Sequence, residues 1–248
     1  MLIDTHCHFN SLSRNLRVEL LSQGLGNYSL IDSSIDRASS SASVSFSKQY
    51  DFIYTSLGFH PFCAKKFRLD ILAEYEKLIE ENKRIVSIGE IGLDYKADSA
   101  LEEQEDVLRH FIQLARDNNL PVVIHNRLNN FRVIDILDEF YQDYENVVFH
   151  CFSYSGEFLE KILERGGFVS FSLNVLRKNK EITSSLKRCP LENMLLETDS
   201  PYMKIKGNSS TPLDIDKVYA FSAFVKEIEQ KELEKIVLSN AKRVFSLA

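Results

Sequence analysis

The chain has 248 residues, of which 44% are hydrophobic and 27% are charged, enough to bury a large core in one domain or two small ones. Its formal net charge is −6, so it lacks the basic excess with which proteins hold nucleic acid over a broad surface. Any nucleic-acid substrate must therefore be bound locally, with the help of bound cations.

No targeting or membrane segment is recognisable in the sequence. The first residues, MLIDTHCHFN, lack the basic and apolar regions of a secretory signal peptide. No apolar run approaches the ~18 residues of a membrane span. The four cysteines show no C-x-x-C spacing, and a chain of this size does not need disulfide bonds. We therefore expect a cytoplasmic protein without a membrane partner, and we infer no obligate protein partner.

Eight short apolar runs, rich in β-forming residues, recur along the chain at intervals of about 27 residues. This interval leaves room for one βα unit per run, and continuous apolar runs suit strands buried on both faces of a parallel sheet. In chain order the predicted strands are Leu2–Thr5, Tyr28–Ser33, Phe52–Leu57, Ile85–Ile88, Pro121–Ile124, Val147–Phe149, Gly167–Phe171 and Met194–Glu197.

Amphipathic stretches between these runs predict helices, because their apolar residues recur at spacings of three and four. The Ser-rich segment Arg37–Tyr50 is either a disordered insert or, as we favour, a weak helix. The later predicted helices are Leu69–Asn82, Leu101–Asn118, Phe131–Tyr144, Phe158–Arg165 and Lys231–Leu247. The alternation predicts an α/β fold, a (β/α)8 TIM-type barrel forming a single domain over residues 1–248. An open doubly wound sheet is the alternative, but no Gly-rich dinucleotide fingerprint follows any predicted strand.

Histidines gather at the C-terminal ends of the predicted strands, which is the face of a barrel where catalytic residues collect. Only His110 lies within a predicted helix, and the other five are His6, His8, His60, His125 and His150. Two residues apart on a strand, His6 and His8 point to the same face and could bind one metal together. They could also be polar residues that are hydrogen-bonded at the barrel mouth.

Later strands also end in side chains that bind metals, namely Glu90, His125, His150 and Asp199. A buried carboxylate without a partner is costly, so a metal or another cation must balance it. Gly89 and Gly92 would let neighbouring groups approach Glu90 closely. Four histidines and two carboxylates exceed what one tetrahedral metal needs, which favours two divalent cations bridged by Glu90. A single zinc with spare acid and base groups is the alternative.

Segments in the same order from end to end resemble the TatD family of metal-dependent deoxyribonucleases, within the amidohydrolase-like superfamily. They are IDTHCHF at the start, GFHP at 58–61, IGEIGLDY at 88–95, LPVVIHNR at 120–127, VVFHCFS at 147–153, LLETDSPY at 195–202 and NAKRVF at 240–245. The resemblance covers essentially the whole chain and implies a (β/α)8-type barrel. It also implies one metal site at His6, His8 and Asp199 and another at His125 and His150, with Glu90 between them.

The resemblance implies a 3′-5′ exodeoxyribonuclease that cleaves DNA, with RNA as a further candidate substrate. From the ligands we expect two divalent cations (Mg, Mn or Zn) that activate water, with Glu90 and Asp199 as catalytic residues and Asp199 accepting the proton. The main alternative is a hydrolase of small-molecule esters, amides or lactones on the same dinuclear site. A metal- or nucleotide-binding protein without catalysis is a third hypothesis, which the intact ligand set disfavours.

The surroundings of the predicted site are less typical of the family. The segment 203–212, MKIKGNSSTP, contains lysines where members commonly have a loop with Pro and Arg. Arg127 and His60 are the candidate substrate-binding residues. Arg127 could hold a phosphate with its planar guanidinium or pair with a carboxylate such as Asp94, and His60 could contact substrate, act as an acid or only shape its loop. We expect Asp94 and Tyr95 to support the ligands.

Overall fold

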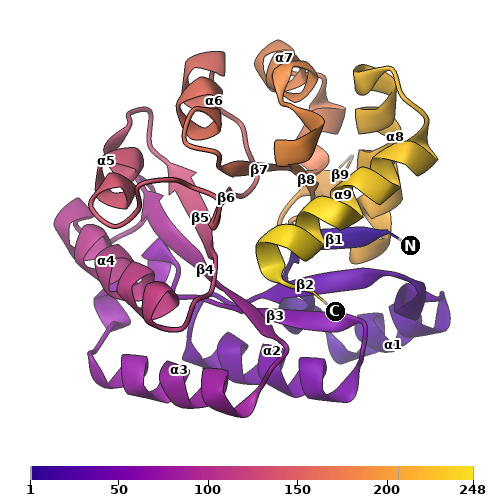
Figure 1. The fold of residues 1–248 in the computed structure, drawn as a ribbon. Helices are drawn as coiled ribbons and strands as arrows, with labels where there is room; N and C mark the ends of the chain where they lie inside the picture. The colour runs from indigo at the N-terminus through magenta and orange to yellow at the C-terminus, as the bar shows by residue number, and fades with distance from the viewer. Residues whose placement is uncertain (1, 206, 248) are drawn as a thin grey trace.

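The structure, a computed structural model, describes residues 2–205 and 207–247. Within them, eight strands follow one another around a barrel in sequence order, and each hydrogen-bonds in parallel to the next (Figure 1). The strands are β1 Ile3–Cys7, β2 Ser29–Ser33, β3 Ile53–Leu57, β4 Ile85–Asp94, β5 Val122–Arg127, β6 Val147–Phe149, β7 Phe168–Phe171 and β8 Met194–Leu196. The predicted (β/α)8 barrel is confirmed.

Helices connect the strands on the outside of the barrel, and two more follow β8 (Figure 1). They are α1 Arg14–Ser22, α2 Arg37–Gln49, α3 Asp70–Glu81, α4 Leu101–Asp117, α5 Arg132–Asp138, α6 Gly156–Leu163, α7 Lys180–Arg188, α8 Ile215–Lys226 and α9 Gln230–Phe245. A two-stranded hairpin, β9 Lys204–Ile205 and β10 Asn208–Ser209, lies between β8 and α8. Apolar side chains fill the space that the strands enclose and the space under the helices.

The Ser-rich segment forms a helix, α2, because its serines serve as a cap and as small packing residues. The Asp36 carboxylate accepts a hydrogen bond from the Ser39 backbone N–H at 2.9 Å, which satisfies a free donor of the first turn. On the buried face, Ser40 Oγ lies 2.8 Å from the hydroxyl of Tyr75. The disordered alternative for this segment is therefore wrong.

Helix α5 is shorter than predicted, because it ends at Asp138 rather than at Tyr144. The side chain of Tyr144 turns back and donates a hydrogen bond to Asp138 Oδ1 at 2.6 Å. Its backbone N–H donates to the carbonyl of Arg165, on the next βα unit, at 2.6 Å. These contacts with another part of the fold end the helix, and an amphipathic pattern cannot reveal them.

Strand β4 continues past its predicted end at Ile88 as far as Asp94. Its glycines lie where β5 approaches most closely. A Cβ atom on Gly89 would lie 2.5 Å from the Cβ of Val123, and one on Gly92 would lie 1.7 Å from the carbonyl oxygen of His125. The close approach expected at these glycines is therefore confirmed, and it brings the end of β4 against the end of β5.

The barrel closes where the end of β1 meets the turn after β8. The Asp199 N–H donates to the His6 carbonyl at 2.9 Å, and the His8 N–H donates to the Ser200 carbonyl at 2.7 Å. The buried carboxylate of Asp4 accepts hydrogen bonds from the backbone and the hydroxyl of Thr198, at 2.9 and 2.6 Å. Helix α9 packs against both strands, so the last helix lies beside the first strand (Figure 1). We call this junction the β1/β8 seam.

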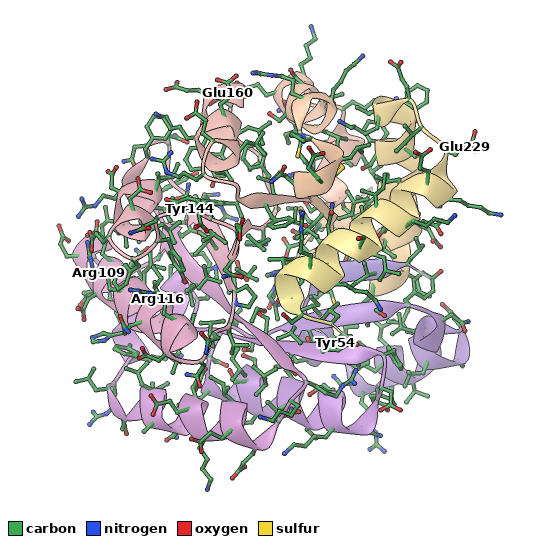
Figure 2. The ribbon with its side chains drawn as sticks, in the orientation of Figure 1. Tyr54, Arg109, Arg116, Tyr144, Glu160 and Glu229 are labelled. Atoms are coloured by element: carbon green, nitrogen blue, oxygen red, sulfur yellow. The ribbon has the colours of Figure 1, made fainter. Side chains whose placement is uncertain are left out.

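Charged side chains cover the outer surface, as Glu160 on α6 and Glu229 before α9 illustrate (Figure 2). Across the described residues, none of the helices is both long and apolar enough to cross a lipid bilayer. All four cysteines are free thiols. The cytoplasmic location expected from the sequence stays a prediction.

Candidate active site

The C-terminal ends of the strands bring all six predicted ligands into one cluster at the mouth of the barrel. They come from β1, β4, β5 and the turns after β1, β6 and β8, and each is at most 9% exposed: His6, His8, Glu90, His125, His150 and Asp199. All except His6 line a cavity of 740 Å³ that opens at this face. A cavity of this size accommodates a substrate the size of a nucleotide.

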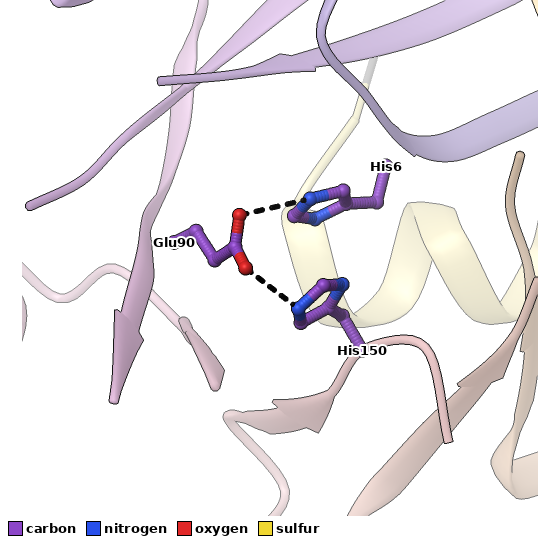
Figure 3. A group of neighbouring side chains, drawn as sticks. All are labelled: His6, Glu90 and His150. Carbon is purple, nitrogen blue, oxygen red and sulfur yellow. Dashed lines mark ion pairs between the residues drawn. The ribbon is translucent and has the colours of Figure 1, made fainter. Parts of the chain in front are cut away.

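Glu90 lies at the centre of the cluster, and each of its carboxylate oxygens faces a different pair among the four predicted ligand imidazoles. Oε2 is 3.5 Å from Nε2 of both His6 and His8. Oε1 is 2.6 Å from Nδ1 of His125 and 2.9 Å from Nε2 of His150. Figure 3 shows the carboxylate between His6 and His150. The arrangement divides the cluster into two halves that share one carboxylate.

Asp199 completes the first half of the cluster. Its Oδ1 is 3.4 Å from Nε2 of His8, and the two Nε2 atoms of His6 and His8 are 3.2 Å apart. One donor atom from each of these three residues lies within 4.8 Å of the others, which is close enough for a single cation to contact all three. The donor set of imidazole nitrogens and carboxylate oxygens therefore suits a divalent metal.

Groups behind the imidazoles hold their rings in position. The Nδ1–H of His8 donates to the Ser33 carbonyl at 2.9 Å, and Nδ1 of His6 lies 3.1 Å from the hydroxyl of the same serine. The Nε2–H of His125 donates to Asp94 Oδ2 at 2.9 Å. Asp94 therefore supports a predicted ligand, as expected. Tyr95 is 63% exposed, and the expectation that it supports a ligand is wrong.

Glu197, which the sequence reasoning did not single out, lies fully buried behind His150. Its Oε1 accepts a hydrogen bond from the Cys151 N–H at 2.8 Å. The same oxygen is 3.4 Å from Nδ1 of His150, an ion-pair distance without hydrogen-bond geometry. One feature of the sequence could have pointed to Glu197, which ends a predicted apolar strand two residues before Asp199. A carboxylate at such a position is costly to bury unless a partner offsets its charge.

Electrostatics in the cluster favour ionised carboxylates. Burial raises the pKa of Glu90, but His150, His60 and His125 outweigh it and hold the pKa well below its usual value. Burial also raises the pKa of Asp199, and the hydrogen bond and charge of His8 turn the net shift downward. Burial lowers the pKa of His150, yet Glu90 and Glu197 raise it well above its usual value. Positive charge next to these carboxylates is thus strongly stabilised, as a cation site requires.

The two candidate substrate-binding residues both line the cavity. His60 is 8% exposed, and its Nε2 is 3.4 Å from Glu90 Oε1. Burial lowers the pKa of His60 and outweighs the opposite effect of Glu90. The guanidinium of Arg127 is half-exposed and lies 3.1 Å from Asp94 Oδ2, so the pairing considered for this residue is present. Arg127 still reaches the mouth of the cavity through its exposed edge.

Further residues at the cavity mouth were not predicted from the sequence. Arg177 is exposed, and its Nη2 lies 3.7 Å from the sulfur of Met203. In the part of the chain that the structure describes, no carboxylate lies within ion-pair distance of Arg177. The rings of Phe62 and Tyr202 are more than half exposed and contact the rings of His60 and His8, at centroid distances of 4.8 and 4.7 Å. Among the described residues, the mouth thus combines a guanidinium that has no carboxylate partner with exposed aromatic rings.

A model of the TatD related DNase family matches residues 3–246. The chain belongs to the TatD family. Over its full length this TatD protein is 31% identical to the uncharacterized metal-dependent hydrolase YabD of Bacillus subtilis, and the match covers 100% of both chains. It is 29% identical to TATDN3 of Mus musculus, provisionally named a deoxyribonuclease, with 98% of this chain and 88% of the relative covered. The protein is therefore a metal-dependent hydrolase.

Solved structures support the same fold for this TatD protein. The crystal structure of the TatD homologue YJJV from Escherichia coli superposes with a TM-score of 0.89 at 24% identity, covering 100% of this chain and 98% of that one. The TatD family hydrolase from Entamoeba histolytica superposes with a TM-score of 0.86 at 22% identity, covering 98% and 97%. Because both identities are below 25%, the two structures support the barrel fold and its strand order, and no more than that.

Proposed function

We propose that this TatD protein is a metal-dependent phosphodiesterase that removes nucleotides from the 3′ end of DNA, and also accepts RNA. The observation that carries the proposal is the division of the cluster by Glu90, with one carboxylate oxygen toward each pair of imidazoles. Such a shared carboxylate is typical of sites with two cations a few ångströms apart, which are common in nucleases and phosphatases.

In this proposal the first cation is held by His6, His8 and Asp199 and the second by His125 and His150, with Glu90 between the two. Mg, Mn and Zn all remain candidates, because carboxylates favour the first two and imidazoles favour the third. Divalent cations supply the Lewis acidity that activates water and neutralises the charge of a phosphate. This neutralisation is how a protein of net charge −6 would bind an acidic polymer.

The residues of the chain have separate tasks in the proposed reaction. Asp199 is ionised and faces the cavity, so its carboxylate can orient the attacking water and accept its proton. Arg127 and Arg177 lie at the mouth, where their guanidinium groups can hold phosphates next to the one that is cleaved. The exposed rings of Phe62 and Tyr202 offer stacking surfaces for unpaired bases, which favours a single-stranded end.

The proposal is tested with protein stripped of metal and reloaded with Mg²⁺, Mn²⁺ or Zn²⁺. Single-stranded DNA labelled at its 5′ end, RNA, an aryl ester and a lactone are supplied in parallel. We expect a ladder of DNA fragments that shorten from the 3′ end, and at least a ~100-fold loss of rate in Glu90→Gln because the shared carboxylate loses its charge. Glu74→Gln, which removes an exposed carboxylate paired with Arg37, is the matched control.

Two outcomes contradict the proposal in different ways. Turnover of the ester or lactone without DNA cleavage indicates the small-molecule hydrolase instead. Equal rates for Glu90→Gln and Glu74→Gln would mean that the cluster is not where the reaction takes place.

A further inference from the structure

His60 differs from the neighbouring histidines in the group that lies behind its ring. The ring nitrogens of His8 and His125 that face away from Glu90 contact acceptors, namely the Ser33 carbonyl at 2.9 Å and the Asp94 carboxylate at 2.9 Å. Nδ1 of His60 instead lies 3.1 Å from the backbone nitrogen of Phe62. A backbone N–H can only donate, so this contact has the opposite polarity.

The polarity matters because a neutral imidazole has one N–H and one lone pair, and the hydrogen bond of one nitrogen decides the state of the other. His8 and His125 donate from behind, which leaves a lone pair directed at Glu90 and the cavity. A metal ligand needs this lone pair. Both residues are thus prepared to bind a cation.

His60 has the opposite arrangement, with a hydrogen rather than a lone pair on the nitrogen next to Glu90. Its Nδ1 accepts from the Phe62 N–H, so the hydrogen of the neutral ring is on Nε2, the atom that lies 3.4 Å from Glu90 Oε1. The local sequence explains this contact. His60 precedes the 3-10 helix η3, Pro61–Lys66, and because Pro61 has no N–H, the first free donor of that helix is the N–H of Phe62.

Distance alone would suggest that His60 is a metal ligand. Its Nε2, an oxygen of Glu90 and a nitrogen of His125 all lie within 4.8 Å of one another, and all three residues are buried. The hydrogen on Nε2 opposes this role, because a cation at that position would have to displace it. His60 also lines the cavity, and its Nε2 lies next to the half of the cluster formed by Glu90, His125 and His150, where an entering substrate oxygen can accept this hydrogen.

We propose that His60 is a hydrogen-bond donor to a phosphoryl oxygen of the substrate and not a further ligand of the cation held by Glu90, His125 and His150. The proposal rests on the phosphodiesterase function proposed above. A neutral N–H at this position stabilises the negative charge that grows on the phosphoryl oxygen as the water attacks. Removal of one such fixed donor typically lowers kcat by about 10²–10³-fold.

The test combines a count of bound metal with kinetics. His60→Ala, His60→Gln, His125→Ala and the wild type are loaded with Mn²⁺ and freed of excess metal, and the Mn²⁺ per chain is measured by mass spectrometry. We expect His60→Ala to keep the wild-type Mn²⁺ content and lose about 10²–10³-fold in kcat on single-stranded DNA. His60→Gln places an amide N–H near the position of Nε2 and recovers at least about tenfold of that loss. His125→Ala, the matched control, loses Mn²⁺.

The metal count remains informative if DNA proves not to be the substrate, because it does not depend on turnover. Loss of Mn²⁺ in His60→Ala, to the extent seen in His125→Ala, overturns the proposal and makes His60 a ligand. An unchanged kcat in His60→Ala also overturns it. If His60→Ala fails to fold, nitrogen-15 NMR spectra of wild-type protein labelled at histidine and loaded with Zn²⁺ show which nitrogen of the His60 ring carries the hydrogen. The proposal requires the hydrogen of the His60 ring on Nε2, and a zinc-bound Nε2 contradicts it.

Discussion

Asp94 links the buried part of the site to its exposed mouth. Its Oδ2 accepts from His125 and pairs with Arg127, and its side chain has no exposed surface of its own. The carboxylate therefore orients a proposed ligand, makes its imidazole a better electron donor and anchors a guanidinium at the place where substrate enters.

We expect Asp94→Asn to weaken metal binding at the half of the cluster formed by Glu90, His125 and His150. The asparagine oxygen can still accept from His125, but without a charge the imidazole becomes a poorer donor. Loss of such a partner typically lowers metal affinity by about 10–100-fold. Titration of Zn²⁺ into the stripped protein measures the change. Asp98→Asn is the control, because that carboxylate is fully exposed and pairs with exposed Lys65. Equal affinities in the two variants would show that Asp94 has no such role.

At the residue scale, the sequence predicts side chains whose position follows from strand direction alone. His6, Glu90 and His150 each lie at or just after the C-terminal end of a predicted strand in a parallel barrel, so they must meet at one face. Glu197 and Ser33 were not predicted, because a partner behind a ligand depends on the angle between neighbouring strands. The expectation that Tyr95 supports a ligand is wrong because β4 ends at Asp94 and the chain leaves the barrel there.

Strand β4 determines how the two halves of the site approach each other, because it carries Glu90 and contacts β5 through its glycines. The register of the β4/β5 pair shifts between Ile88 and Ile91, around the residue that supplies the shared carboxylate. Sequence patterns did not predict this part of β4, since Gly and Glu are poor strand formers by propensity. Tertiary contacts with β5 override that preference.

Gly92→Ala should therefore be strongly destabilising. The new methyl group would lie 1.7 Å from the His125 carbonyl oxygen, at a residue whose φ is 152°. Backbone strain and overpacking together cost on the order of 2–6 kcal/mol. Gly207→Ala is the matched control, because φ there is also positive, at 87°, but among the described residues beyond its chain neighbours no atom lies within 4 Å of the added Cβ. Strain alone costs about 1–2 kcal/mol at that position. Urea unfolding measures both values, and similar losses in the two variants would contradict the close approach of β4 and β5.

At the scale of the whole molecule, the cluster joins elements from all around the barrel. Its six residues come from three strands, β1, β4 and β5, and from the turns after β1, β6 and β8. A cation bound there contacts groups that are far apart in the unfolded chain, so it stabilises the folded state over the unfolded state. The periodic runs predict the barrel, but its closure depends on the contacts of Asp4 and Thr198, which no local pattern encodes.

Removal of metal should consequently lower the melting temperature. A cation present at 100 times its dissociation constant adds about 2.7 kcal/mol per site. For a chain of this length that corresponds to a rise in Tm of roughly 5–10 °C per site. Calorimetry with Mn²⁺ and with EDTA measures the difference, and Glu90→Gln should show a smaller one because both halves lose the shared charge. A Tm that does not respond to metal would rule out tight binding at the cluster.

The β1/β8 seam also sets the moment at which the enzyme becomes complete during its synthesis. His6 and His8 leave the ribosome long before Asp199, which emerges only after all eight strands of the barrel have been made. The growing chain holds Glu90, His125 and His150 well before the first half of the cluster can form. We therefore expect a nascent chain that lacks the β8 end of the β1/β8 seam to have no hydrolytic activity, because Asp199 cannot yet meet His6 and His8.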